Sequence, residues 1–308
     1  MERINKSSVT DARGNLLSIQ WQDQSEDFRQ WLAVLADIEL RRLAPGQEAD
    51  TWVLARGGRP AYVLKVWNKG LRADAKEQHR FLSHARQAGL PVPRSVGWGR
   101  DEGDHQVLAT RFAGYPIDHP TDEQIRRCAR LLAQVHTTPV GSFERAGYGH
   151  DDPLEYLVTR YFPRLEHHPD IAAILQQLQV AIPRREGGLI HGDYNLGNIL
   201  VAGERMTIID WSNAHLGDVR YDTAWASTLL CIYGQPHHAS VFLLAYEANA
   251  AAPATRRERA LLEAMAGLRW LLLNRSFTLP LGREKQPQMV DFVHQRLPAP
   301  LRRTLREP

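Results

Sequence analysis

Residues 189–211 read LIHGDYNLGNILVAGERMTIIDW, and the fold and chemistry of this chain are inferred from this stretch. Two apolar, β-branched runs, Asn198–Ala202 and Met206–Asp210, flank a Gly-Glu-Arg tripeptide. The pattern predicts a β-hairpin with a three-residue loop. The outermost residues of the two runs, Asn198 and Asp210, are then expected to face each other at the open end of the hairpin.

Opposed side chains at the end of such a hairpin lie about 5 Å apart at their Cβ atoms. One Mg²⁺ ion can therefore bridge the amide oxygen of Asn198 and the carboxylate of Asp210, because Mg²⁺ prefers oxygen ligands. Asp193 lies on the loop ahead of the hairpin, where it can accept a proton from an attacking hydroxyl. His191 can brace this loop through a hydrogen bond to the backbone. Asp193 alone suits a turn and Asp210 alone a strand end, but together these residues predict metal-assisted transfer to a hydroxyl.

The spacing H-x-D-x-x-x-x-N at residues 191–198, followed by I-D-W at residues 209–211, resembles the aminoglycoside phosphotransferase and choline kinase family, which is related to the protein kinases. The resemblance implies a bilobal protein-kinase-like fold. It also implies transfer of the γ-phosphoryl group of ATP, with GTP as an alternative donor. In that template Asp193 is the catalytic base, and Asn198 and Asp210 hold Mg²⁺.

A second motif, GDVRYD at residues 217–222, resembles the family's sequence after the metal-binding aspartate. The resemblance implies that Asp222 is structural and ties the catalytic loop to the start of a helix. Asp222 and His191 are therefore predicted to support the loop that carries Asp193. The resemblance spans about residues 43–225.

A strand with a buried-looking lysine lies upstream of the catalytic segment. Ala61–Trp67 follows a turn at Gly57-Gly58, and a lysine such as Lys65 in a largely apolar strand needs a partner. The helix predicted at Ala73–Ala88 carries Glu77 on its apolar stripe, so an ion pair would satisfy both residues. The resemblance implies that this pair holds the donor phosphates. If the two residues do not pair, Lys65 is a surface lysine and Glu77 a solvated charge on its helix.

A first strand is predicted at Thr51–Ala55, and the turn at Gly57-Gly58 joins it to Ala61–Trp67 in a hairpin. The loop Leu43–Thr51 precedes this first strand and contains a single glycine, Gly46. A full G-x-G-x-x-G phosphate-binding motif is therefore absent. The backbone amides near Gln47 and Ala49 are the candidates for phosphate contacts, and the neighbouring acids are expected to point outward.

The segment Val107–Phe112 predicts a strand that runs into the hinge between the lobes. The resemblance implies that its backbone holds the purine edge of the nucleotide, with contacts at Ala109 and Arg111. A plain strand leading into a loop would show the same pattern, because recognition through the backbone leaves no side-chain signature.

A strand-rich first part and a helix-rich second part predict an α+β protein with two lobes. Residues 1–112 are expected to form the nucleotide-binding lobe, with a hinge at about 107–120. Residues 113–308 are expected to form the helical catalytic and acceptor-binding lobe. Its first helix is predicted to begin with a capping box formed by Thr121 and Gln124.

Composition limits the class of protein. Hydrophobic residues make up 43% and charged residues 24%, as in an ordinary globular protein. The net charge is +3 and the arginine pairs are scattered, so no nucleic-acid partner is expected. The longest apolar stretch, Leu261–Leu273, contains Glu263 and Arg269 and is no membrane span. Cys128 and Cys231 form no C-x-x-C motif, and free thiols suit a reducing cytoplasm.

The partner is expected to be a small-molecule alcohol, whose identity the sequence leaves open. A polycationic aminoglycoside needs an acidic pocket, for which the candidates are Asp151, Asp152, Glu155 and Asp218. A quaternary amine such as choline favours aromatic faces, for which the candidates are Trp211, Trp225, Tyr233 and Trp270, although such residues more often form core. The histidine pairs have no ligand partner at metal spacing and are expected at the surface, at His167-His168 and His237-His238.

The leading hypothesis is an aminoglycoside phosphotransferase-like kinase, with a choline, ethanolamine or macrolide kinase as the alternative. A nucleotide-binding pseudokinase would keep the fold without turnover, but the intact catalytic residues argue against it. A metal-dependent hydrolase would leave Lys65 and Glu77 without a purpose. The oligomeric state stays open.

Overall fold

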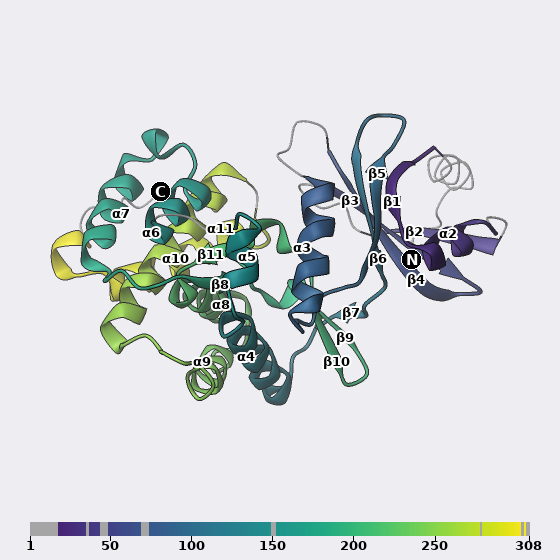
Figure 1. Ribbon diagram of the computed structural model, residues 1–308. Helices are drawn as coiled ribbons and strands as arrows, with labels where there is room; N and C mark the ends of the chain where they lie inside the picture. The colour runs from purple at the N-terminus through teal and green to yellow at the C-terminus, as the bar shows by residue number, and fades with distance from the viewer. Residues whose placement is uncertain are drawn as a thin grey trace. The chain divides into compact units, whose positions relative to one another are not determined.

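The computed structural model describes residues 18–34, 37–43, 49–68, 74–148, 152–277, 279–302 and 305 (Figure 1). The chain forms two compact units. The first unit consists of Met1–Pro116 and Leu200–Ser212, and the second of Ile117–Ile199 and Asn213–Pro308. The predicted division assumed a single crossing near residues 112–120. The catalytic segment instead contributes residues to both units.

The first unit contains a six-stranded antiparallel sheet in the order β1-β5-β6-β4-β3-β2. Its strands are β1 (Gln20–Gln24), β2 (Ile38–Arg42), β3 (Ala49–Arg56), β4 (Arg59–Trp67), β5 (Ser95–Arg100) and β6 (Gln106–Arg111). The hairpin between β3 and β4 turns at Gly57 and Gly58, whose φ angles of 55° and 70° favour glycine. This turn confirms the predicted hairpin.

Two helices complete the first unit. In α2 (Glu26–Leu32), the fully buried Phe28 packs against Tyr62 of the sheet, with ring centroids 4.6 Å apart. The side chain of Asp74 caps α3 (Ala75–Gln87) by accepting the backbone N–H of Glu77 at 2.9 Å. Helix α3 packs against β5 and β6. It buries Phe81 and Ala85, as the helical spacing predicted.

The catalytic hairpin is shorter than predicted. Its strands are β9 (Ile199–Ala202) and β10 (Arg205–Ile208), and β9 also pairs with β7 (Tyr115–Pro116). The loop has two residues rather than three, because Gly203 adopts a φ of 60° that allows a tighter turn. Asn198 ends a 3₁₀ turn before β9 and Asp210 follows β10. The two residues are therefore not strand residues facing each other in register.

The second unit is mostly helical, and the first of its helices confirms the capping box of Thr121 and Gln124. Two short antiparallel strands, β8 (Gly188–Ile190) and β11 (His215–Gly217), bracket the catalytic segment. The helices are α4 (Asp122–His136), α5 (Gly141–Arg145), α6 (Pro153–Tyr161), α7 (Pro169–Ala181), α8 (Val219–Tyr233), α9 (His238–Glu247), α10 (Arg256–Ser276) and α11 (Gly282–Arg296). Together the two units confirm the α+β class.

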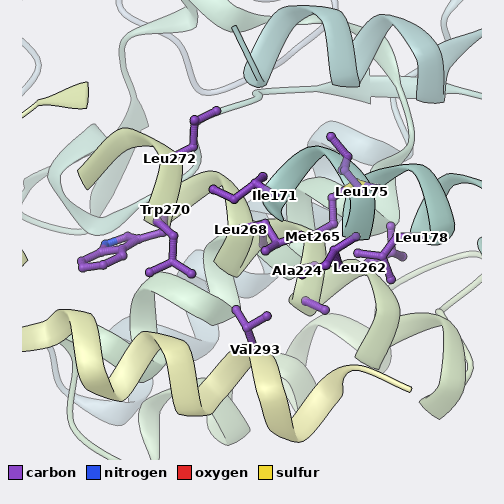
Figure 2. Close-up of a cluster of buried hydrophobic side chains, with 14 of the residues drawn as sticks. Ile171, Leu175, Leu178, Ala224, Leu262, Met265, Leu268, Trp270, Leu272 and Val293 are labelled. Atoms are coloured by element: carbon purple, nitrogen blue, oxygen red, sulfur yellow. The ribbon is translucent and has the colours of Figure 1, made fainter. Parts of the chain in front are cut away.

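The core of the second unit is built around α10, which packs against α7, α8 and α11. Figure 2 shows side chains of these four helices meeting: Ile171, Leu175, Leu178, Ala224, Leu262, Met265, Leu268, Trp270, Leu272 and Val293. Burying each large apolar side chain contributes about 1.5–3 kcal/mol. Residues 261–272 in the middle of α10 are buried by the neighbouring helices, which accounts for their apolar character. Among the described residues, no helix combines the length and apolar character needed to cross a bilayer.

Candidate active site

The loop that carries Asp193 is fixed by a buried carboxylate. Asp222, near the start of α8, accepts the backbone N–H of His191 at 2.8 Å and that of Gly192 at 2.9 Å. Its Oδ2 also lies 3.2 Å from Nε2 of His136 on α4. Burial raises the pKa of Asp222, but the hydrogen bond and positive potential of His136 outweigh it and hold the pKa below its ordinary value. This contact is the one that the motif at residues 217–222 implied for Asp222.

The interior of the loop is set by two local contacts. Nδ1 of His191 accepts the backbone N–H of Asp193 at 3.2 Å, which is the bracing expected of His191. Gly192 has a φ of 78°. A Cβ atom there would lie 2.1 Å from the hydroxyl of Tyr161 and 2.6 Å from the carbonyl of Asn213. Only glycine fits this position.

The carboxylate of Asp193 is held at both oxygens. Nε1–H of Trp225 donates to Oδ1 at 2.9 Å, and Nδ2–H of Asn198 donates to Oδ2 at 3.3 Å. The same amide nitrogen of Asn198 donates to the backbone carbonyl of Asp193 at 2.9 Å, and Asn195 adds a bond of 3.0 Å to that carbonyl. Because these bonds use the nitrogen of Asn198, its amide oxygen is left to act as a ligand.

The first unit carries the other group of site residues. The ammonium of Lys65 on β4 lies 2.8 Å from Oδ1 of Asp210, and the hydroxyl of Ser212 donates to the same oxygen at 3.0 Å. The two side chains are 23% and 38% exposed, so solutes can reach them. Asp210 has a φ of 61°, a conformation that aspartate adopts more readily than most residues. The chain bends there and directs the carboxylate to Lys65.

The predicted pair of Lys65 and Glu77 is wrong for this structure. Lys65 pairs with Asp210, whereas Glu77 forms an ion pair with Arg80 at 2.9 Å. Glu77 lies in the first turn of α3, where Arg80 follows three residues later on the same face. Its side chain is 36% exposed. The apolar stripe of α3 therefore did not make Glu77 a core residue.

The predicted hinge contacts are also corrected. Ala109 lies in the central strand β6 and pairs with Leu64 on one side and Gly97 on the other, so its backbone belongs to the sheet. The guanidinium of Arg111 forms an ion pair with Asp27. The backbone N–H of Arg111 donates to the backbone carbonyl of Arg94 at 2.8 Å. Strand β6 continues to Arg111, two residues beyond Ala109, so the hinge begins later in the chain than predicted.

Of the loop Leu43–Thr51, predicted to contact phosphate, the structure describes only Leu43 and residues 49–51. Gln47 lies outside the described residues. Ala49 begins β3, is buried and pairs with Trp67 of β4. Asp50 forms an ion pair of 2.6 Å with Arg42. Its charge is thereby neutralised, which removes one source of repulsion towards a phosphate.

Two of the acids expected to line an acceptor pocket have other tasks. Asp152 caps α6 through the backbone N–H of Leu154 and Glu155 at 3.0 Å, and it also pairs with Arg184. Asp218 is buried and forms an ion pair of 2.6 Å with Arg220. Asp151 lies outside the described residues. The acidic pocket predicted from these residues therefore loses two of its members.

The aromatic wall expected for a quaternary amine is not assembled from the predicted residues. Trp211 belongs to the first unit, where it packs on Phe81. The indole N–H of Trp270 donates to the hydroxyl of Tyr233 at 2.9 Å. Trp225 does face a cation, but that cation is Arg269 of the protein itself.

One histidine pair departs from expectation. His238 is buried, and His237 lies 2.8 Å from Asp122, a residue distant in sequence. These three side chains are close enough together to consider a metal ion. However, Nδ1 of His238 accepts the backbone N–H of Gln235 at 3.2 Å, so in the neutral ring the proton is on Nε2, which faces Asp122. The nitrogen that would bind the metal is therefore protonated.

The sequence prediction missed His136, Tyr161 and Arg269. His136 ends the predicted helix α4, and Arg269 interrupts an apolar run. A charged residue within such a run was a signal, because buried charges usually have a specific partner. Its partner could not be identified without the fold.

An H-x-D-x-x-x-x-N loop, a lysine on a strand of the sheet and a second aspartate after the loop are features of protein-kinase-like phosphotransferases. The sequence matches the model of the phosphotransferase enzyme family (APH) over residues 39–271, and the chain belongs to this family.

Individual relatives agree with this assignment. Hygromycin-B 4-O-kinase of Escherichia coli is 25% identical in an alignment of 234 positions. The match covers 65% of this chain and 66% of the relative, slightly under two thirds of its length. A thermostable mutant of aminoglycoside phosphotransferase APH(4)-Ia in its apo form is similar with a TM-score of 0.63 and 17% identity, covering 87% of this chain and 98% of that one. A choline/ethanolamine kinase family protein from Mesorhizobium loti has a TM-score of 0.62 and 18% identity, covering 96% of both chains. At these identities the two structures establish the fold alone.

Proposed function

We propose that this protein transfers the γ-phosphoryl group of ATP to a hydroxyl group of a small molecule, with an aminoglycoside as the first candidate acceptor. The observation that carries the proposal is the carboxylate of Asp193. It is partly exposed, and both of its oxygens are oriented by N–H donors, from Trp225 and Asn198. A carboxylate fixed in this way is suited to receive a proton from an alcohol.

The nucleotide is assigned to the residues around Lys65. In the structure its ammonium and the carboxylate of Asp210 neutralise each other at 2.8 Å. On nucleotide binding, the ammonium would leave Asp210 and bind the donor phosphates. Asp210 and Asn198 would hold Mg²⁺, and their carboxylate and amide oxygens are the donor types that this ion prefers. Bound Mg²⁺ would neutralise charge on the phosphates. The backbone amides around Gln47 and Ala49 are proposed to contact the same phosphates.

The adenine base is assigned to the chain just after β6. The structure ends this strand at Arg111, and residues 112–114 are irregular. A backbone that has left the sheet can offer its N–H and C=O groups to a ligand. The purine contact is therefore assigned to the backbone of Ala113 and its neighbours rather than to Ala109 and Arg111.

Proton transfer completes the reaction. As the acceptor oxygen bonds to the γ-phosphorus, the bond from phosphorus to the β–γ bridging oxygen breaks and ADP leaves. The acceptor's proton passes to the carboxylate of Asp193. Asp222 and His191 act on this step only by fixing the loop, through the bonds of 2.8 Å and 3.2 Å described above.

The aminoglycoside assignment is supported by the relatives. The curated relative is a hygromycin-B 4-O-kinase, and a mutant of APH(4)-Ia has been solved as a ternary complex with AMP-PNP and hygromycin B. A choline, ethanolamine or macrolide kinase is the alternative. Trp225, one of the aromatic residues expected to suit choline, already stacks on Arg269 of the protein itself, which favours the first assignment.

The test is consumption of ATP and GTP by the purified protein with Mg²⁺ across a set of alcohols. The set contains hygromycin B and other aminoglycosides, macrolides, choline, ethanolamine, homoserine and sugars. We expect consumption with at least one aminoglycoside, with phosphate on the acceptor by mass spectrometry, and none with Asp193→Ala. Consumption with choline alone would select the alternative. Nucleotide binding without consumption on any alcohol would contradict the proposal and identify a pseudokinase.

A further inference from the structure

Arg269 lies in the middle of α10 and is only 6% exposed, which is unusual for a charged residue. Its guanidinium is sandwiched between the rings of Tyr161 on α6 and Trp225 on α8, with the carbon of the guanidinium 4.0 Å from each ring centroid. This box is made of residues from three helices of the same unit. Cation–π contact with two rings offsets part of the cost of burying the charge.

The charge of Arg269 is directed at the catalytic loop. Its Nη1 donates to the backbone carbonyl of Gly192 at 2.9 Å, so it contacts the residue directly before Asp193. Burial alone lowers the pKa of Arg269, but the electrostatic influence of Tyr221 and Asp193 raises it above its ordinary value. The side chain therefore remains a cation close to the Asp193 carboxylate.

Trp225 connects this cation to the proposed base. The face of its indole ring stacks on Arg269, while its Nε1–H donates to Oδ1 of Asp193 at 2.9 Å. Rotation of the indole would break both contacts, because one rigid ring makes them. The carbonyl of Gly192 and the carboxylate of Asp193 are thus held by two side chains that stack on each other.

We propose that Arg269 and Trp225 are positioning residues for phosphoryl transfer: stacked together, they fix the backbone of the catalytic loop and the orientation of the Asp193 carboxylate. Neither residue belongs to the motifs at residues 191–198 and 209–211. The inference rests on the proposed function, because positioning has a purpose only if Asp193 receives a proton.

A purely structural role predicts a different outcome. Replacing a buried ionic group by a well-packed apolar side chain is often neutral or stabilising for a fold. If Arg269 serves only packing, a methionine in its place should leave turnover unchanged. If it positions the loop, turnover should fall while the fold and the nucleotide affinity persist.

The first test is Trp225→Phe, which keeps an aromatic face for Arg269 and removes the N–H donor to Asp193. The matched control is Trp270→Phe, which removes another buried indole whose N–H also donates at 2.9 Å, in this case to Tyr233. We expect kcat of Trp225→Phe to fall about tenfold relative to Trp270→Phe, the effect of one lost orienting hydrogen bond of ~1.4 kcal/mol. KM for ATP and the melting temperatures of the two variants should agree.

The second test is Arg269→Met, for which we expect a fall in kcat of tenfold or more with KM for ATP unchanged. If this variant fails to fold, Trp225→Phe decides alone. A double-mutant cycle then asks whether the effect passes through the proton uptake of Asp193: in the Asp193→Asn background, whose residual rate is measurable, Trp225→Phe should not lower that rate further.

Equal kcat values for Trp225→Phe and Trp270→Phe would overturn the positioning role while the wild type still transfers phosphate. Absence of transfer by the wild type would instead contradict the proposed function. In that case the loop itself is examined by hydrogen exchange at the amides of residues 191–195. Faster exchange in Trp225→Phe than in Trp270→Phe would support the positioning role, and equal exchange would reject it.

Discussion

The ammonium of Lys65 and the carboxylate of Asp210 lie 2.8 Å apart, although 145 residues separate them in the sequence. Both groups belong to the first unit, because this unit includes Leu200–Ser212, the segment that contains Asp210. Each is partly exposed, so a phosphate and a metal ion can compete for them. In the proposed complex with a metal-bound nucleotide, this ion pair would break, because Lys65 would bind a phosphate and Asp210 would bind the metal ion.

The first prediction concerns this pair. Asp210→Ala should remove the Mg²⁺ dependence of nucleotide binding and weaken the binding of AMP-PNP in Mg²⁺ by about tenfold or more, equivalent to ~1.4 kcal/mol. The reason is that the carboxylate proposed as a ligand to the metal is lost. Isothermal titration calorimetry with and without Mg²⁺ measures the effect. Glu26→Ala, an exposed acid of the same unit, serves as control. Undiminished affinity of Asp210→Ala would reject its role as a metal ligand.

A second prediction separates chemistry from binding at Asp193. Asp193→Asn keeps an oxygen that can accept a hydrogen bond from Trp225, but it cannot take up a proton. We expect kcat to fall by about 10²–10⁴-fold, the usual contribution of a general base. The affinity for nucleotide, measured by calorimetry, should change little. Turnover near that of the wild type would show that another group takes the proton.

The contacts within the loop that carries Asp193 agree with the sequence-based expectation better than the contacts of Lys65, Glu77 and Arg111 do. His191 and Asp193 lie two residues apart on one loop, so their spacing already limited which contacts they could make with each other. The bonds from Asp222 to the loop at 2.8 Å and 2.9 Å follow from a strand and a helix meeting at that loop. Asp222 lies 31 residues after His191, so this contact was expected from the resemblance of the motif at residues 217–222 and not from local spacing.

Partners distant in sequence could not be predicted. Glu77 was assigned to Lys65 by helical periodicity, which gives the face of a helix but not which cation its acidic residue will pair with, here Arg80. Arg111 was expected in a hinge, whereas Asp27, which lies 84 residues earlier, neutralises it. The short two-residue loop at Gly203 also shifted the ends of the hairpin. Such outcomes depend on tertiary packing, which has no signature in a short window of sequence.

The third prediction concerns stability at low pH. The pKa of Asp222 is held below its ordinary value of 3.8, so its ionised form stabilises the fold above that pH, and this contribution is lost as the pH falls through the lower folded pKa. Asp222→Asn should cost about 3–5 kcal/mol at neutral pH, because the loop amides and His136 lose a charged acceptor. Urea unfolding at several pH values should show the difference from wild type shrinking below pH 3.8.

The control for this experiment is Asp291→Asn, which changes an exposed carboxylate on α11 and should have little effect at any pH. A difference between wild type and Asp222→Asn that stays constant over the whole pH range would contradict the linkage. It would mean that the shape of the side chain, rather than its charge, supports the loop.

The fourth prediction tests the close contact between α10 and α11. A Cβ atom at Gly267 would lie 2.4 Å from Cγ2 of Val293 and 3.2 Å from the sulfur of Met289. Alanine favours a helix by about 1 kcal/mol over glycine, but overpacking a core costs about 1–3 kcal/mol. Because the stiff, fully buried Val293 cannot move aside, Gly267→Ala should destabilise the protein. In a Val293→Ala background the same change should be neutral or stabilising, because the clash is gone. Unfolding of the four proteins completes the cycle, and additive effects would show that the helices can separate to admit the methyl group.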